Sequence, residues 1–430
     1  MKKKIALLLT VCLTFGVLSG CGTKSAKTED GKLVIDFCTH LNNNENTPEI
    51  EGFMKENPDI VVKTEILEGS KFSELLQPRI MSNDEPDVIM ISQEMFKNYI
   101  GGGWLEDLSD LPIAEQMKKQ ENITSIFAKD GKYYGVPVSG GYSVHPMYYN
   151  KKIFDKLNIT PPKTEEEFYS VCEAIKQSGV EPVVCGGADA WTIGSLCNPM
   201  ITSEALTHGD DYESQIVDGK LKYSDFSKNT LDFLKKLVDN GYIGKSALTM
   251  KYEQSVQYFA DGKAAMIAQG LWVPELPQIT EADPETLELG TFMNPVLARD
   301  GEGKVRVDVE PDRILIISKN AANKEACKKF VEYFTRDDVL TEYLNRQNLD
   351  TMFTHLELKK SEVLQDFYKD LLDPENTSIL SIKYEYNMPK AVSSATLDAF
   401  QNILAGAGAD DELAKIDAAF DNNRDKAEKR

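Results

Sequence analysis

Apolar and polar positions along this chain follow two alternating patterns, one typical of strands and one typical of helices. Short runs rich in β-branched residues, such as "KLVIDFC", "IVVKTEIL", "PDVIMIS" and "DRILIIS", predict buried strands. Between them apolar residues recur at helical spacing, as in "NTPEIEGFMKENPDI" and "NKEACKKFVEYF". This alternation predicts an α/β protein whose sheets are covered by helices on both faces.

One predicted helix carries signals at both of its ends. In "PPKTEEEF", Thr164 and Glu167 have the spacing of a capping box, in which each side chain accepts a hydrogen bond from the other's backbone. Phe168 and Val171 then follow on one helical face, and Gly179 ends the segment. Because both ends are specified locally, this helix is a firm element of the predicted fold.

The first residues of the chain follow neither pattern. Lysines occupy positions 2–4, a mainly apolar run covers residues 5–18, and small residues precede Cys21. A membrane-spanning helix needs ~20 apolar residues. The shorter run therefore predicts a secretory signal peptide over residues 1–20. Residues 21–30 are mostly polar and predict a flexible tether.

The end of the apolar run, "LSGC", resembles the lipobox of bacterial lipoproteins. The resemblance implies that the signal is removed before Cys21 and that Cys21 then carries acyl chains. The protein would be lipid-anchored on the extracellular face of the cell membrane, or in the periplasm if the cell has an outer membrane. The alternative is an ordinary secreted protein cut at a small residue.

Composition and charge restrict the classes of partner. The chain has 430 residues, of which 41% are hydrophobic, enough to bury cores in two domains. Its formal net charge of −21 argues against nucleic acid as a partner. No later segment approaches ~18 consecutive apolar residues, so no further membrane span is expected.

Cysteines remaining after the signal and the anchor are few and irregularly spaced. They are Cys38, Cys172, Cys185, Cys197 and Cys327. A secreted disulfide scaffold is small and rich in cysteine, and this chain is neither. Cys185 and Cys197 could pair, although we expect free thiols. The absence of a CxxC motif also argues against a thioredoxin-like or zinc-ribbon site.

Catalytic and cofactor templates are missing from the sequence. It has no GxSxG, HExxH, GxGxxG or EF-hand pattern, and "GYIGKSAL" has Asp239 where a phosphate-binding loop needs glycine. The four histidines are too widely spaced for a local metal motif. A glycosidase needs only two carboxylates, but the sequence singles out no pair. We therefore expect no catalytic residue, no metal site and no cofactor.

Aromatic and glycine-rich segments recur along the chain in a distinctive order. They include "YGVPVSGGYSVHPMYYNKKIF", "GKAAMIAQGLW", "LIISKNAANKEACKKFVEYF" and "MPKAVSSATLDAFQNILAG". Together with "FMKENPDIVV" and "EPDVIM", these segments resemble the family 1 extracellular solute-binding proteins that serve ABC-type importers. The resemblance covers nearly all of the mature chain.

The resemblance implies a fold of two α/β lobes arranged as a periplasmic-binding-protein-like clamshell, with a ligand cleft between the lobes. Three inter-lobe crossings are expected, near residues 136–140, 309–313 and 345–350. The first lobe would contain residues 31–137 and 314–343, and the second would contain residues 138–313 and 344–430. A monomer that works with the permease subunits of an ABC transporter is also expected.

Aromatic side chains in loop-like surroundings are the candidates for holding a sugar, because a pyranose offers apolar C–H faces to a flat ring. Trp272, in "GLW", matches the position where the family commonly stacks its ligand. Trp191, in "GGADAWT", lies between glycines and a helix start. Gly141 and Tyr142 follow the first expected crossing and would face the cleft. Packing is the alternative role for each tryptophan, and it is the expected role for Trp104.

Polar side chains near strand ends are the candidates for the ligand's rim. In open α/β sheets the carboxyl ends of strands face the ligand. Glu94 follows "PDVIMIS", and His40 and Asn42 follow "KLVIDFC". Asp189 and Asp312 are added because they neighbour Trp191 and the second expected crossing. The alternative for each is an ordinary solvated surface group.

Three classes of function fit these observations. The resemblance favours capture of a carbohydrate, a sugar or oligosaccharide, and its delivery to an ABC transporter permease. A binding protein for another solute, such as a peptide or polyamine, is the second class. A lipid-anchored carbohydrate-active enzyme is the third, and turnover of a glycan by the purified chain would identify it.

Anchoring through Cys21 can be tested directly. Without the thiol no acyl chain can be attached, so Cys21→Ser should release the protein into the medium or leave its signal unprocessed. Detergent-phase partitioning of the wild-type and variant proteins measures the difference. Equal partitioning of both into the detergent phase would contradict lipidation.

Overall fold

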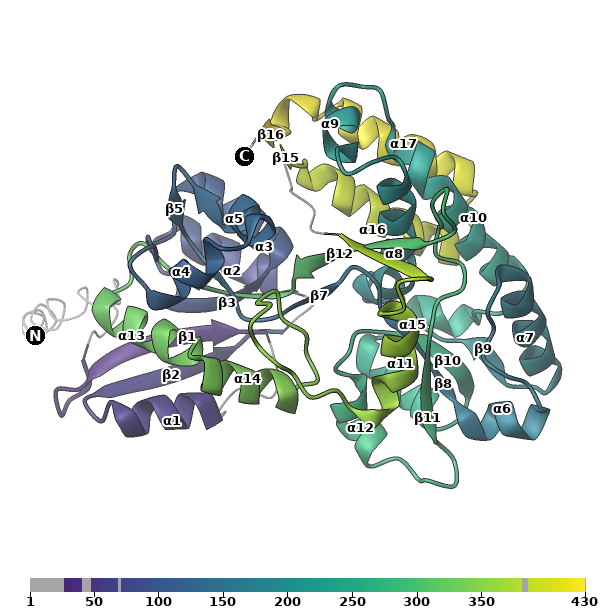
Figure 1. The fold of residues 1–430 in the computed structure, drawn as a ribbon, viewed down its shortest axis with the longest axis horizontal. Helices are drawn as coiled ribbons and strands as arrows, with labels where there is room; N and C mark the ends of the chain where they lie inside the picture. Colours follow the sequence, from purple (N-terminus) through teal and green to yellow (C-terminus); the bar gives the residue numbers. More distant parts are fainter. Residues whose placement is uncertain (1–26, 41–47, 69–70, 381–385, 430) are drawn as a thin grey trace, which may run out of the picture.

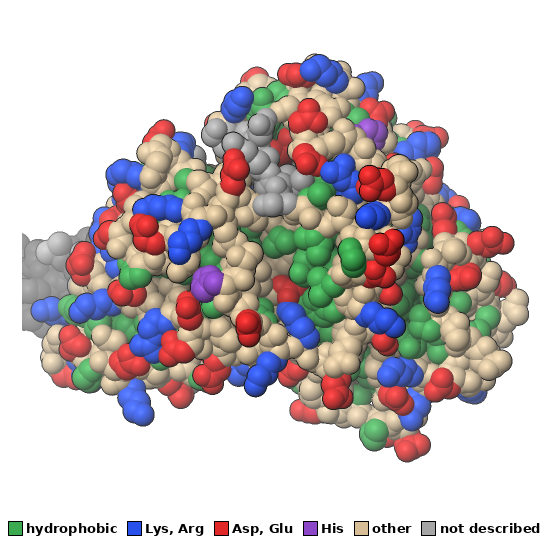
Figure 2. All heavy atoms as spheres, viewed as in Figure 1, with side chains coloured by type: hydrophobic (Ala, Val, Ile, Leu, Met, Phe, Trp, Pro, Cys, Tyr) green, Lys and Arg blue, Asp and Glu red, His purple; other side chains and the backbone are tan. Residues whose placement is uncertain are grey.

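Two α/β lobes lie side by side in the computed structural model, joined near the middle of the molecule (Figure 1). The structure describes residues 27–40, 48–68, 71–380 and 386–429. The expected signal peptide, Cys21 and Asn42 lie outside these residues. Figure 2 shows acidic and basic side chains distributed over both lobes on the face it presents.

The first lobe is built on a five-stranded sheet with the order β2-β1-β3-β13-β6. Strands β1, β2 and β3 are parallel, and β13 runs antiparallel to both β3 and β6. The strands are β1 (Leu33–Thr39), β2 (Ile60–Ile66), β3 (Val88–Ser92), β6 (Val136–Pro137) and β13 (Arg313–Ile317), with the hairpin β4 (Ala128–Lys129) and β5 (Lys132–Tyr133). The helices are α1 (Pro48–Glu56), α2 (Phe72–Met81), α3 (Gln93–Gly102), α4 (Pro112–Met117), α5 (Glu121–Phe127), α13 (Lys324–Phe334) and α14 (Asp337–Arg346).

The second lobe is built on a four-stranded sheet with the order β11-β8-β10-β9. Its strands are β8 (Pro146–Asn150), β9 (Glu181–Val183), β10 (Ala264–Ala268) and β11 (Leu289–Met293). The α-helices are α6 (Lys151–Leu157), α7 (Glu165–Gln177), α8 (Trp191–Thr207), α9 (Tyr212–Val217), α10 (Tyr223–Asp239), α11 (Tyr252–Ala260), α12 (Pro277–Thr280), α15 (Gln365–Leu371), α16 (Lys390–Leu404) and α17 (Ala409–Asp421). Short elements complete it: η2 (Lys245–Thr249), η3 (Val273–Glu275), η4 (Glu362–Leu364), η5 (Arg424–Lys426), β15 (Tyr386–Asn387) and β16 (Glu428–Lys429).

A third sheet joins the lobes. It has the order β14-β12-β7, with β7 (Gly140–Tyr142), β12 (Val305–Pro311) and β14 (Thr377–Leu380). β7 follows β6 of the first lobe, and β12 leads into β13, so the two connections run antiparallel beside each other. These connections lie where the first two crossings are expected, and the α/β clamshell fold is confirmed.

Local signals explain why the predicted helices form. Thr164 caps α7, because its hydroxyl accepts a hydrogen bond from the Glu167 backbone N–H at 3.2 Å. The return bond differs from the predicted capping box: the Glu167 carboxylate accepts from the backbone of Lys163 at 2.7 Å. Helix α2 continues through Pro78, at the position where a bend is expected.

Each lobe has its own hydrophobic core. The expected boundary at residue 343 falls inside α14, and the side chains of Leu344, Leu349 and Phe353 pack into the core of the first lobe. The chain joins the second core at Leu364. We therefore propose that the third connection lies later than expected, between residues 358 and 364.

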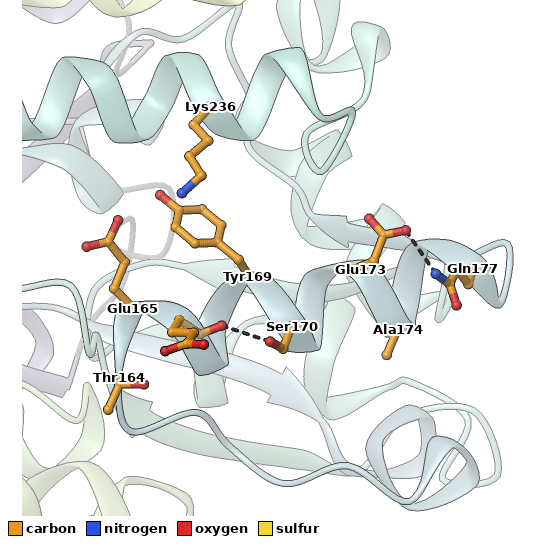
Figure 3. Close-up of a pocket in the computed structure, with 9 residues that line it drawn as sticks. Thr164, Glu165, Tyr169, Ser170, Glu173, Ala174, Gln177 and Lys236 are labelled. Carbon is orange, nitrogen blue, oxygen red and sulfur yellow. Dashed lines mark hydrogen bonds between the residues drawn. The ribbon is translucent and has the colours of Figure 1, made fainter.

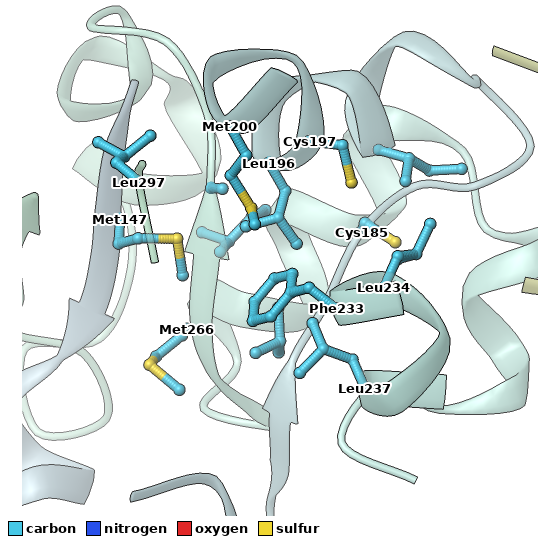
Figure 4. Close-up of a cluster of buried hydrophobic side chains, with 14 of the residues drawn as sticks. Met147, Cys185, Leu196, Cys197, Met200, Phe233, Leu234, Leu237, Met266 and Leu297 are labelled. Atoms are coloured by element: carbon cyan, nitrogen blue, oxygen red, sulfur yellow. The ribbon is translucent and has the colours of Figure 1, made fainter. Parts of the chain in front are cut away.

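Both cores contain buried cysteines. Cys38 and Cys327 lie in the first lobe and Cys172, Cys185 and Cys197 in the second, where Cys185 and Cys197 are free thiols, as expected. Figure 4 shows Cys185 and Cys197 among leucine, methionine and phenylalanine side chains. Burial raises the pKa of Cys38 and of Cys185 to about 12, so their thiols stay protonated and unreactive.

Thiol counting tests this arrangement. A chain that lacks residues 1–20 and carries Cys21→Ser should react slowly with Ellman's reagent when folded, because its thiols are buried and protonated. In denaturant all five thiols should react. The absorbance of the released thionitrobenzoate gives the count before and after unfolding. A count of three in denaturant would mean that one pair, such as Cys185 and Cys197, forms a disulfide.

Candidate ligand-binding site

Three aromatic side chains from separate parts of the second lobe meet at its junction with the first lobe. Trp191 begins α8, Tyr252 begins α11, and Trp272 directly precedes η3. The ring centroids of Trp191 and Tyr252 are 4.7 Å apart, and the Trp272 indole N–H donates to the Tyr252 hydroxyl at 2.8 Å. We call Trp191, Tyr252 and Trp272 the aromatic trio. Two of its members, Trp191 and Trp272, are residues that the sequence predicts for the site.

Trp272 is held in one orientation by its surroundings. A Cβ added at Gly270 would lie only 2.0 Å from an indole carbon, so only glycine allows the ring to lie over this backbone. The Gly270 carbonyl is itself fixed, since it accepts a hydrogen bond from the buried Tyr148 hydroxyl at 2.9 Å. Tyr252 holds the indole N–H. The flat ring of Trp272 is therefore pre-organised.

The trio lies where the two lobes meet. Trp272 is half-buried and packs against both hydrophobic cores. Beside it, the Asn348 amide of the first lobe donates to the Glu275 carboxylate of η3 at 2.6 Å. Lys251, next to Tyr252, lies 3.9 Å from the carboxylate of Glu68 in the first lobe. These contacts bring groups of both lobes to the same site.

Asp189 supports the trio. Its carboxylate accepts a hydrogen bond from the Tyr252 backbone N–H at 2.9 Å, at the first residue of α11. This bond satisfies one of the unpaired N–H groups at the start of the helix. Asp189 thereby ties the loop before Trp191 to the helix that carries Tyr252, and the residue positions the trio.

His40 and Asp312 lie closer to the connections between the lobes. The Ser139 hydroxyl donates to the exposed carboxylate of Asp312 at 3.3 Å. Burial lowers the pKa of His40 in the first lobe and of His145 in the second, and the negative charge of Asp312 opposes this shift at both rings. His145 lies beside the trio, with its ring centroid 6.4 Å from that of Trp272. Asp312 thus links the surroundings of the two histidines electrostatically.

Gly141 and Tyr142 lie in a different place. They line a cavity of about 680 Å³ beside the third sheet, together with Asp350, Phe353 and Lys360. No member of the aromatic trio lines this cavity. On the face of the molecule that Figure 2 presents, hydrophobic side chains gather between the lobes. The structure therefore does not bring Gly141 and Tyr142 together with Trp272.

Glu94 and Asn42 are the two remaining residues that the sequence predicts for the site. Glu94 is the second residue of α3, directly after β3, as its position in the sequence predicts. Asn42 lies outside the described residues.

Trp104, expected to pack, lies edge-on to Tyr99 with ring centroids 6.0 Å apart. The next residue, Leu105, pairs with Ser318. Ser318 directly follows β13, at the end of this strand that is farther from Arg313 and from the connections between the lobes.

A second hollow lies on the outer surface of the second lobe, along α7 and α10 (Figure 3). There the Lys236 ammonium lies 3.4 Å from the centre of the Tyr169 ring, a cation–π contact. Glu165 and Glu173 line the same hollow. It contains none of the sequence-predicted site residues.

Several residues of the junction were not singled out by the sequence. They are Tyr252, His145, Gln269 and Thr192. Tyr252 reaches Trp272 across 20 positions of sequence through a side-chain contact that no local pattern encodes. His145 does fall in the quoted segment "YGVPVSGGYSVHPMYYNKKIF", and its place in this aromatic, glycine-rich segment was the available signal.

The chain belongs to the bacterial extracellular solute-binding protein family, which matches residues 45–340, more than half of its length. Its two lobes, with candidate residues gathered at their junction, define a binding protein of this class. Among the described residues no helix is long and apolar enough to cross a bilayer. The same part of the chain contains no cluster of three or more metal-ligating side chains.

Relatives and solved structures support the class. A multiple sugar-binding protein of Streptococcus mutans is 29% identical over 349 residues, which cover 79% of this chain and 80% of the relative. The melibiose/raffinose/stachyose-binding protein MelE of Bacillus subtilis is 22% identical over 345 residues, 78% of each chain. The structure of the solute-binding protein RafE in complex with raffinose has a TM-score of 0.71 and 22% identity, covering 91% of this chain and all of RafE.

The bond between Tyr252 and Trp272 can be tested by removing one hydroxyl. Tyr252→Phe deprives the half-buried indole N–H of its acceptor, which should lower the free energy of unfolding by about 1 kcal/mol. Urea denaturation followed by fluorescence measures the change. The control is Tyr134→Phe, because no hydrogen bond of the Tyr134 hydroxyl is found in the described part of the chain. Equal stability of the two variants would contradict the proposed role of Tyr252.

Proposed function

We propose that this protein captures a sugar or oligosaccharide outside the cell and delivers it to the permease of an ABC transporter. The observation that carries the proposal is the aromatic trio, which places flat rings at the junction of two lobes. Trp191 is 38% exposed, so a face of its ring is accessible to a ligand. A ring held in this way can pack against the C–H face of a pyranose.

The polar groups around the trio also suit a neutral polyol. Burial favours the uncharged form of both His40 and His145, since it lowers the pKa of each. Two carboxylates that the sequence predicts for the site lie nearby. Asp189 accepts a hydrogen bond from the Tyr252 backbone N–H, and Asp312 accepts one from the Ser139 hydroxyl. A polyamine would need several carboxylates without other partners, and neither of these two is left without one. This balance favours a sugar over a cationic solute.

The relatives bind ligands of the same class. One is named for multiple sugars, another for melibiose, raffinose and stachyose, and RafE was solved with raffinose. The bacterial extracellular family supports a role in solute capture rather than catalysis. We therefore place Trp191 and Trp272 at the ligand's faces, and His40 and Asp312 at its rim. Asp189 would act through Tyr252.

Attachment to the membrane is part of the same proposal. The "LSGC" segment supports lipidation at Cys21 after removal of residues 1–20. The tether that follows would hold the lobes near the membrane surface, where they can reach a permease. The extracellular family supports the location outside the cytoplasm.

Substitution of the tryptophans tests the site. Removing a central aromatic anchor should weaken sugar binding about tenfold or more. Trp191→Ala should do so with little change in melting temperature, because Trp191 is exposed. Trp272→Ala should weaken binding and also lower the melting temperature, because Trp272 packs against both cores. Isothermal titration with melibiose, raffinose, stachyose and maltotriose measures affinity.

Trp104→Ala is the matched control, since Trp104 lies at the far end of the first-lobe sheet and should leave affinity unchanged. Wild-type affinity in both Trp191→Ala and Trp272→Ala would show that neither is a stacking residue. If the wild-type protein bound spermidine and none of the sugars, the ligand would be a polyamine and not a sugar.

A further inference from the structure

Buried polar atoms without hydrogen-bond partners lie beside the aromatic trio. They are Thr192 Oγ1, Gln269 Nε2 and His145 Nδ1 of the second lobe. A fourth such atom, His40 Nδ1 of the first lobe, belongs to a ring that feels the charge of Asp312, as His145 does. Thr192 is 1% exposed and Gln269 is fully buried. Native proteins leave few buried polar atoms unsatisfied. Several of them next to a candidate binding site indicate a partner that comes from outside the chain.

Backbone pairing explains why three of these residues lie together. β10 and β8 are antiparallel neighbours, with Ala268 opposite Met147. Gln269 follows β10 and His145 precedes β8, so they leave the sheet at the same edge, and the Gln269 N–H donates to the Pro146 carbonyl at 3.4 Å. Gln269 and His145 therefore both lie at this end of the second-lobe sheet, on neighbouring strands.

Helix α8 adds the third residue. Ser195, one turn into α8, donates its hydroxyl to the Gln269 side-chain oxygen at 3.3 Å. The Ser195 backbone also forms a hydrogen bond with the His145 ring. Thr192 lies one turn earlier on the same helix, directly after Trp191 of the trio. Ser195 thus joins the first turn of α8 to both strand ends.

The free groups have a defined chemistry. Because the Gln269 oxygen already accepts from Ser195, its amide nitrogen is left to donate. The Thr192 hydroxyl can donate or accept, and a neutral imidazole nitrogen can do either according to its tautomer. The set carries no formal charge at neutral pH. It matches vicinal hydroxyl groups, which also donate and accept.

We propose that Thr192, Gln269 and His145 are specificity-determining residues that hydrogen-bond the hydroxyl groups of the bound sugar, while His40 contacts the same sugar from the first lobe. This inference rests on the proposed function and assigns the polar contacts that the aromatic trio cannot make. The ligand supplies the partners that these atoms lack in the protein alone. Contacts from both lobes favour the arrangement in which the lobes lie together around the sugar.

Two substitutions test the assignment. Thr192→Val keeps the shape of the side chain and removes only its hydroxyl, and Gln269→Met keeps its length and removes the amide. Each should weaken raffinose binding roughly five- to tenfold in isothermal titration, the loss expected for one hydrogen bond to a ligand. The melting temperature of the sugar-free protein should stay unchanged or rise for Thr192→Val, because an unpartnered buried hydroxyl is removed. Stachyose and melibiose serve as further probes.

Thr64→Val is the matched control. The Thr64 hydroxyl is also buried and without a partner, but it lies inside strand β2, at the edge of the first-lobe sheet. Its removal should leave affinity unchanged. Wild-type raffinose affinity in both Thr192→Val and Gln269→Met, with Trp191→Ala impaired, would overturn this inference and leave the proposed function intact. Binding of none of the three sugars by the wild-type protein would overturn both.

Discussion

One continuous pair of antiparallel segments joins the lobes, and the position of every candidate site residue depends on it. Residues 136–142 run beside residues 309–315, from the first-lobe sheet into the third sheet. The pairing is kept between the two sheets, because Val138 N–H donates to the Arg313 carbonyl at 2.8 Å and Asp312 N–H donates to the Ser139 carbonyl at 3.0 Å. The backbone groups of these segments are therefore satisfied by pairing with each other.

Some side chains along these two paired segments hold the lobes in place, and others face the junction. Arg313 is buried and donates to the Tyr343 hydroxyl at 2.5 Å, which fixes the second connection to α14 of the first lobe. Its neighbour Asp312 is exposed and acts on the surroundings of both histidines. The later part of the chain is fixed by Asp350, whose carboxylate accepts from the Tyr368 hydroxyl of α15 at 2.6 Å and also pairs with Lys360. Asp312 and Arg313, consecutive residues of the second connection, thus serve the site and stability separately.

The sequence predicted what local patterns determine. The strand around Ile91, the helix capped by Thr164 and the first two connections follow from periodicity, capping and family resemblance, and the structure contains them. We propose a later third connection than the sequence predicts, because Leu349 and Phe353 pack into the first core although no helical or strand period assigns them to a lobe. Trp191 and Trp272 were found as isolated loop residues. Tyr252 was missed, because its role depends on a hydrogen bond to one tryptophan and a ring contact with the other.

The strong negative charge of the chain and the neutral character of the junction have separate physical roles. Most of the described ion pairs, such as Lys228 with Asp410, are exposed, where water and salt leave each pair with little net energy. Such charges keep an extracellular protein hydrated and dispersed. The unpartnered side-chain atoms of Thr192, Gln269 and His145 at the junction are instead buried, where an unpaired charge would be costly and a neutral hydrogen bond gains strength. A site made of indole, phenol, amide and neutral imidazole therefore discriminates by shape and hydrogen bonding. That is the discrimination a neutral sugar requires, and the acidic surface does not oppose it.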